Sequence, residues 1–141
     1  MSRIVVGVDG SDHAHRALEW AMYEAGLRNA PLTVVTVFQI AKDHWGLADL
    51  HYPQDEPARQ RAGEAAQQAA DKVAAQLNGP KPPAVLVKAV SGVPAEVLIN
   101  ESKDADLLVV GTRGGGFEEI MLGSVSSKVA HHAACPVVII R

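Results

Sequence analysis

Short apolar runs alternate along this chain with longer segments of helical periodicity. The runs of strand length are Ile4–Val8, Leu32–Phe38, residues 84–90, residues 107–110 and Val137–Ile140. Most of them are apolar at successive positions, and not only at every second one, which is typical of strands buried on both faces of a parallel sheet. The pattern therefore predicts five buried strands.

The segments between these runs have the spacing of amphipathic helices. After Ser11 and Asp12, either of which can cap a helix, apolar residues recur at positions 14, 17, 18, 21, 22 and 25. An alanine-rich helix is predicted over residues 55–77, because Asp55 and Pro57 supply a cap and a first-turn residue and Asn78-Gly79-Pro80 ends the helix. Two shorter helices are predicted, over Pro94–Ser102 and residues 124–133.

The resulting order βαβαβαβαβ predicts an α/β fold. We expect an open five-stranded parallel sheet with helices on both faces and right-handed crossovers between the strands. The chain has 141 residues, of which 48% are hydrophobic, so a single domain over residues 1–141 can bury one substantial core. Residues 39–56 form a polar connection without a regular pattern, and the sequence leaves open whether it acts as a lid.

Composition narrows the class of partner. The net charge of −3 argues against a general nucleic-acid binder, which would normally have a basic face. Cys135 is the single cysteine, so an intramolecular disulfide is excluded. The apolar start at Ile4–Val8 is too short for a signal peptide or a membrane span, so we expect a cytoplasmic protein with no membrane partner.

The stretch with the clearest chemistry is residues 106–116, DLLVVGTRGGG, together with residues 122–127, LGSVSS. A strand ends in a glycine turn, and Gly123 with the hydroxyl residues after it opens the last predicted helix. Gly111, Gly114 and Gly123 can take positive φ, which would let the backbone approach a ligand without a Cβ in the way. Backbone N–H groups from both ends would converge on a phosphate. The alternative is an ordinary strand-to-helix loop.

A second candidate lies at the end of the first strand, in Val8-Asp9-Gly10-Ser11. If the first and fourth strands are neighbours, Asp9 faces the glycine loop, and its carboxylate can accept hydrogen bonds from ribose hydroxyls. The alternative for Asp9 is a capping or turn role. The chain lacks the Gly-x4-Gly-Lys-Ser/Thr motif of P-loop proteins and the Gly-x-Gly-x-x-Gly spacing of dinucleotide folds.

Over residues 3–141 these motifs resemble the universal stress protein family. The resemblance is carried by IVVGVDGS at residues 4–11, GVPAEV at 92–97, ADLLVVGTRG at 105–114 and LGSVSSKVAHHAACPVVIIR at 122–141. It implies strand order 3-2-1-4-5, which places the first strand beside the fourth. It also implies a homodimer through Val137–Ile140, an apolar edge strand that needs covering.

The ATP-binding branch of this family has the pattern Gly-x2-Gly-x9-Gly-Ser/Thr. The resemblance implies that adenine and ribose contact Gly7, Val8, Asp9 and Val37. It implies that ribose and phosphates contact Val110, Gly111, Arg113, Gly114, Gly123, Ser124, Val125 and Ser126. The expected cofactor is ATP, with or without Mg²⁺ or Mn²⁺.

This chain departs from that pattern at one place, because residues 115–122 provide eight positions where the pattern has nine. The shorter loop is expected to weaken contacts with the outer phosphates, so AMP or a cyclic nucleotide is an alternative ligand. A nucleotide-free dimeric interaction protein is a second alternative. We expect no catalytic residue, so any ATP hydrolysis or autophosphorylation of Ser124 or Ser126 would be slow and incidental to signalling.

Overall fold

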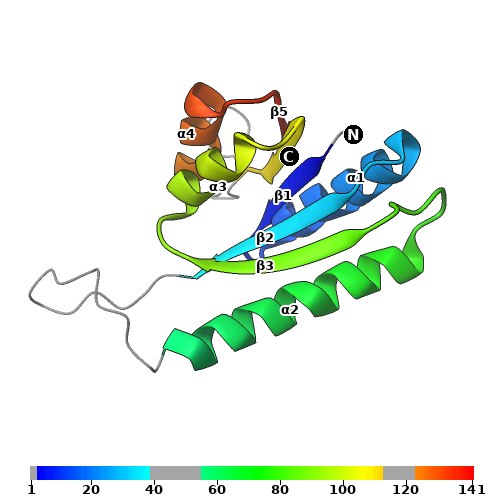
Figure 1. Ribbon diagram of the computed structural model, residues 1–141, viewed down its shortest axis with the longest axis horizontal. Helices are drawn as coiled ribbons and strands as arrows, with labels where there is room; N and C mark the ends of the chain where they lie inside the picture. Colours follow the sequence, from blue (N-terminus) through cyan, green and yellow to red (C-terminus); the bar gives the residue numbers. More distant parts are fainter. Residues whose placement is uncertain (1–2, 39–54, 113–122) are drawn as a thin grey trace, which may run out of the picture.

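The structure of the protein is a computed structural model that describes residues 3–38, 55–112 and 123–141. Its elements in chain order are β1 (Ile4–Val8), α1 (Asp12–Arg28), β2 (Leu32–Phe38), α2 (Asp55–Gln76), β3 (Val85–Ser91), α3 (Pro94–Ser102), β4 (Leu107–Gly111), α4 (Ser124–His132) and β5 (Val137–Ile140). Helices α1 and α2 cover one face of the sheet, and α3 and α4 cover part of the other face (Figure 1).

The five strands form one sheet in the order β3-β2-β1-β4-β5, and all four pairs are parallel. This confirms the predicted fold class and places β1 beside β4. In the described residues no helix has both the length and the hydropathy that spanning a bilayer requires.

Four of the predicted elements have boundaries that are wrong by one residue. Strand β3 runs over Val85–Ser91, one position later than predicted, because Ser91 still pairs with Phe38 of β2. Strand β4 includes Gly111, which pairs with Ile140 of β5. Helices α2 and α4 each end one residue early, and at the end of α4 the backbone of Ala133 turns to an extended conformation with ψ 147°.

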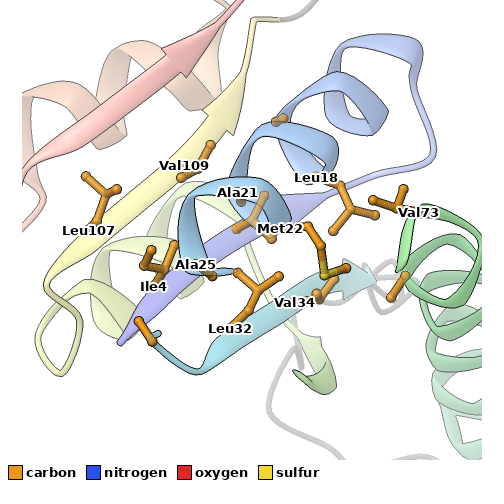
Figure 2. Close-up of a cluster of buried hydrophobic side chains, with 14 residues drawn as sticks. Ile4, Leu18, Ala21, Met22, Ala25, Leu32, Val34, Val73, Leu107 and Val109 are labelled. Carbon is orange, nitrogen blue, oxygen red and sulfur yellow. The ribbon is translucent and has the colours of Figure 1, made fainter. Parts of the chain in front are cut away.

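Two apolar clusters, one on each face, explain why the strands are apolar at successive positions. Figure 2 shows the cluster under α1, where Ala21, Met22 and Ala25 pack on side chains of β1, β2 and β4. On the opposite face Val5, Val35 and Leu108 pack against α3 and α4. Neighbouring residues of one strand therefore bury their side chains in different clusters.

A charged network connects α3 to the sheet. Glu101 accepts hydrogen bonds from Arg3, at 2.9 Å, and from Lys88 of β3, at 2.9 and 3.1 Å. Burial raises the pKa of the Glu101 carboxyl, but the hydrogen bonds from Lys88 and Arg3 outweigh burial and hold it below its ordinary value. Near neutral pH the ionised Glu101 carboxylate therefore connects α3 to Arg3, which precedes β1, and to Lys88 of β3.

Two helical glycines have opposite surroundings, which gives a matched test of packing. A Cβ on Gly26 of α1 would overlap the carbonyl oxygen of Pro80, whereas a Cβ on Gly63 of α2 would lie 3.7 Å from the Cβ of Ala89. We expect Gly26→Ala to lower the free energy of unfolding by about 2 kcal/mol. We expect Gly63→Ala to raise it by up to about 1 kcal/mol, because alanine is the better helix former. Urea denaturation measures both changes, and changes of the same sign would contradict the packing described.

Candidate functional site

A pocket opens at the carboxyl ends of β1, β2 and β4, on the face covered by α3 and α4. We call it the carboxyl-end pocket. It holds about 610 Å³ of empty space, part of it open to solvent. Its described lining residues are Gly7, Val8, Asp9, Ser11, Ala14, Val35, Val37, Pro94, Leu98, Val110, Gly111, Thr112, Gly123, Val125 and Ser126.

The topology explains this position. The chain passes from β1 to β2 and β3 on one side, and β4 and β5 lie on the other side of β1. In open parallel sheets the crevice at such a switch point is where ligands bind. Three helices also begin at this edge, because the N-caps or first turns of α1, α3 and α4 contribute Ser11, Pro94 and Gly123 to the lining.

The floor of the pocket is apolar. Val35 and Val37 of β2 and Val110 of β4 come from the sheet, while Leu98 of α3 and Val125 of α4 close the sides. These branched side chains form a surface without hydrogen-bonding groups. Such a surface suits a flat ring whose polar atoms point toward the rim.

The start of α4 is arranged for an anion. Its N-cap residue Gly123 has no side chain to accept from the first-turn amides, and the first turn holds no acidic residue. The hydroxyl of Ser126 donates to the carbonyl oxygen of Gly123, at 3.1 Å, so it does not cap these amides. No described side chain therefore caps the positive end of the helix dipole, which can face a negative group beside Val125 and Ser126.

The geometry of Asp9 is compatible with both roles that the sequence leaves open, the turn role and the binding of ribose hydroxyls. Its Oδ1 atom accepts a hydrogen bond from the backbone N–H of Ser11, at 2.9 Å, which is the turn role. Its Oδ2 atom has no partner among the described residues. Gly10 has φ +84°, and this left-handed turn holds Asp9 at the rim of the pocket. One carboxylate oxygen is thus available to accept from a ligand hydroxyl.

The predicted reason for two of the glycines is wrong. Gly111 lies within β4 and Gly123 has φ −63°, so neither adopts positive φ. A Cβ on Gly111 would lie 2.6 Å from the carbonyl oxygen of His13 in α1, and a Cβ on Gly7 would lie 2.8 Å from Leu98 of α3. Gly7 and Gly111 therefore let helices approach the strands closely.

Most of the predicted site residues meet in this pocket. They are Gly7, Val8, Asp9, Val37, Val110, Gly111, Gly123, Val125 and Ser126. Ser124 opens α4 with an exposed side chain and does not line the pocket. Arg113 and Gly114 lie outside the described residues, as do residues 115–122. The binding role of each residue stays a prediction.

Several lining residues were not predicted from the sequence. Pro94 and Leu98 are four positions apart on α3, so helical spacing could have placed them on one face. Thr112, the residue after β4, is 8% exposed, and its hydroxyl lies 3.3 Å from Nδ1 of His13. No sequence signal pairs Thr112 with His13, because ninety-nine positions separate them.

Other reactive side chains lie away from the pocket. Nδ1 of His131 lies 2.8 Å from the carbonyl oxygen of Ser127 within α4. The thiol of Cys135 lies beside the apolar cluster under α3 and α4, and burial, with a smaller effect of Asp106, raises its pKa. Within the part of the chain that the structure describes, no three histidine, cysteine or acidic residues are grouped to hold a metal ion.

A parallel sheet in this order, with a ligand-sized pocket at its switch point, defines a Rossmann-like α/β protein. The family model of the universal stress protein family matches residues 1–141. The chain belongs to that family.

Relatives support this assignment over the whole chain. A universal stress protein of Thermus aquaticus is 37% identical over 141 residues, with 98% of this chain and 97% of that protein covered. One of Mycobacterium tuberculosis is 39% identical over 140 residues, but the match covers 98% of this chain and only 47% of that protein. The chain therefore spans about half the length of this mycobacterial relative.

Solved structures give the same result. The universal stress protein UspA from Lactobacillus plantarum has a TM-score of 0.75 and 27% identity, covering 99% of this chain and 97% of its own. A universal stress protein in complex with cAMP has a TM-score of 0.69 and 28% identity, with 99% of this chain and 96% of that chain covered. A universal stress protein from Archaeoglobus fulgidus in complex with dAMP has a TM-score of 0.63 and 27% identity, with 100% of this chain and 98% of that chain covered.

Gly111 and Gly123 differ in their backbone positions, so we expect substitution by alanine to change the free energy of unfolding by different amounts. We expect Gly111→Ala to lower the free energy of unfolding by about 2 kcal/mol, because the added Cβ displaces the first turn of α1. Gly123→Ala keeps an allowed φ of −63° and should cost less than about 1 kcal/mol, the difference between glycine and alanine as N-caps. Urea denaturation compares them. A larger loss for Gly123→Ala would show that α4 requires the glycine for its fold.

Proposed function

We propose that this universal stress protein binds an adenine nucleotide in the carboxyl-end pocket and acts as a regulatory module. The observation that carries the proposal is the meeting of three features in one pocket: an apolar floor, a carboxylate oxygen with no partner among the described residues, and a helix start that no described side chain caps. These features match a base, a ribose and a phosphate in that order. The ligand predicted from the glycine pattern is ATP.

In this proposal the adenine ring lies on Val37 and Val110, where the pocket offers branched apolar side chains. Oδ2 of Asp9 accepts hydrogen bonds from the ribose hydroxyls. The phosphate nearest the ribose lies at the start of α4, where first-turn amides and the helix dipole favour negative charge.

The relatives with bound ligands favour a second candidate of the same class. The two universal stress proteins named above were solved with cAMP and with dAMP, each of which carries one phosphate group. Two of the described helix starts at the pocket lack a side-chain cap, but α3 carries the acidic Glu96 in its first turn, whereas the first turn of α4, beside Gly123, holds no acidic residue. A nucleoside monophosphate or cyclic nucleotide therefore fits the described residues as well as ATP does.

The proposed role is binding, and no reaction is assigned to the pocket. The hydroxyl of Ser126 donates to a backbone carbonyl. The hydroxyl of the lining residue Thr112 lies 3.3 Å from Nδ1 of His13, and we assign this pair no role as a nucleophile and base. Asp9 is the only carboxylate among the described lining residues. Mg²⁺ or Mn²⁺ bound with ATP would accordingly take most of its ligands from phosphate oxygens and water.

A charge placed at the first turn of α4 tests the phosphate position. We expect Ser124→Glu to weaken AMP binding about tenfold, which is about 1.4 kcal/mol, because the new carboxylate competes for the helix dipole. The matched neutral variant Ser124→Gln should bind AMP as the wild type does. The exposed side chain of Ser124 lies outside the pocket lining, so neither change fills the pocket. Isothermal titration calorimetry measures the affinities, with ATP as a parallel ligand.

Adenosine, which has no phosphate, is the control ligand for this experiment. Its affinity should be the same for both Ser124 variants and the wild type. Asp9→Asn should weaken adenosine and AMP alike, because it removes the charge from the ribose acceptor while Oδ1 can still accept from Ser11. If the wild type fails to bind AMP, ATP or adenosine, the proposed function is wrong. If Ser124→Glu binds AMP normally, the phosphate does not lie at α4.

We also propose that the protein forms a homodimer through β5, an edge strand of the sheet. The backbone carbonyl oxygens of Pro136 and Ile140 accept hydrogen bonds from the N–H groups of Leu108 and Thr112, on the β4 side. Because the backbone groups of successive residues point to opposite edges of a strand, those of Ile139 point to the open edge. An edge that exposes such groups beside partly buried apolar side chains is a ready site for a second copy.

Proline at the outward position tests the dimer. We expect Ile139→Pro to convert a dimer into a monomer, because it removes an edge N–H and prevents strand pairing. The control is Val85→Pro on β3, the other edge strand, which should leave the dimer intact. Sedimentation velocity at micromolar concentration gives the masses. A monomeric wild type, or a dimer that survives Ile139→Pro and not Val85→Pro, would contradict the proposed interface.

A further inference from the structure

A second cavity lies on the opposite face of the sheet, between the start of α1 and the first half of α2. We call it the α1–α2 cavity. It holds about 760 Å³ of empty space, part of it open to solvent. Residues 8, 9, 11 and 14 line both this cavity and the carboxyl-end pocket, so the loop after β1 separates the two.

Thr36 is a buried polar residue in the wall of the α1–α2 cavity. It is 8% exposed and lies on the same face of β2 as Leu32 and Val34, which belong to the apolar cluster under α1. Its hydroxyl has no hydrogen-bond partner among the described residues. Fully enclosed side-chain polar atoms of the described residues all have partners, so the Thr36 hydroxyl is accessible from the cavity. A polar group bound in the cavity could therefore form a hydrogen bond with this hydroxyl that no described residue provides.

The rest of the wall is shaped by small side chains. Ala62, Ala65, Ala66 and Ala69 of α2 face the cavity. One turn further along α2, Ala70 belongs to the apolar cluster under α1 and is 2% exposed. Ala66, at 5% exposed, is as buried as a core residue but lies outside that cluster. The alanines therefore leave space that no described side chain fills.

The polar groups of the wall favour a ligand that donates a hydrogen bond. The Oδ2 atom of Asp9 has no partner among the described residues and can accept. The other titratable group of the wall is His15, whose Nε2 atom lies 3.5 Å from the carboxylate of Glu19. A hydroxyl group can donate to Asp9 or to Thr36 and can also accept from Thr36.

We propose that the α1–α2 cavity binds a small neutral alcohol with an apolar body, its hydroxyl group bonded to Thr36 and its body packed on the alanines of α2. This site shares four lining residues with the nucleotide site, Asp9 among them, but its proposed hydrogen bond goes to Thr36, so it does not depend on the proposed function. Its affinity would come from apolar contact with a preformed space and from one hydrogen bond to a hydroxyl that otherwise has no partner.

Two leucine variants of α2 test the space itself. Ala66→Leu should keep the melting temperature within about 2 °C of the wild type or raise it, because the added carbons enter the cavity. Ala70→Leu, one turn away, should lower it by about 5 °C or more, because it overpacks the apolar cluster. Differential scanning calorimetry measures both. If Ala66→Leu lowers the melting temperature as much as Ala70→Leu, there is no space at Ala66 and the proposal is wrong.

Benzyl alcohol and toluene are the ligand probes, since they differ mainly in the hydroxyl group. We expect benzyl alcohol to give saturable ¹H–¹⁵N shifts at the amides of Thr36, Ala62 and Ala66, with an affinity several-fold higher than that of toluene. Thr36→Val, which keeps the shape of the side chain, should remove this difference. Ala66→Leu should abolish the shifts and leave AMP binding unchanged, which separates this site from the carboxyl-end pocket.

Three results would overturn the proposal. They are an absence of saturable shifts in the wild type, equal affinities of the wild type for the two probes, and benzyl alcohol binding that persists in Ala66→Leu. Failure of AMP to bind would contradict the proposed function alone, because the probe experiment requires no nucleotide.

Discussion

The close approach of α1 to the end of β4 is the contact on which the carboxyl edge of the sheet depends. Gly111 has no Cβ, so the carbonyl of His13 can occupy the space where a side chain would begin. This contact holds the first turn of α1 beside β4, and with it Ser11 and the turn at Asp9. On the opposite face of the sheet, Gly7 leaves room for the tip of the Leu98 side chain of α3, a contact with a flexible side chain and not with backbone. The first turn of α1 is thus positioned by the missing Cβ of Gly111.

The helices that form the pocket are fixed at the opposite end of the sheet. Glu101, near the end of α3, is bonded to Arg3 and Lys88. The buried hydroxyl of Ser102 accepts from the N–H of Ala134, at 2.9 Å, and so connects α3 to the residues after α4. Because stabilising polar contacts lie far from the pocket, Oδ2 of Asp9 and the start of α4 can remain without partners at modest cost to the fold.

The sequence was sufficient to predict the strands, the helices, their order and most of the pocket, because the inner strands β1, β2 and β4 are buried on both faces and each helix has an apolar stripe. The sequence was insufficient wherever a residue contacts another residue that lies far away along the chain. Glycine at position 111 was recognised as special, but its reason is the carbonyl of His13, which no local pattern reveals. The alanine-rich helix was predicted, whereas the space between it and α1 was not. That space depends on how far apart two helices lie on the sheet, and alanine spacing alone leaves this distance open.

The electrostatics of the carboxyl-end pocket follow from its backbone. Its described lining residues include no lysine, arginine or histidine and one carboxylate, Asp9. Attraction for an anion in this part of the pocket must therefore come from helix starts, whose effect is confined to the first turn. A phosphate beside Val125 and Ser126 lies within that reach, and a phosphate further from the helix start gains less. In the proposed function, this confines the favourable position to the phosphate that adjoins the nucleoside.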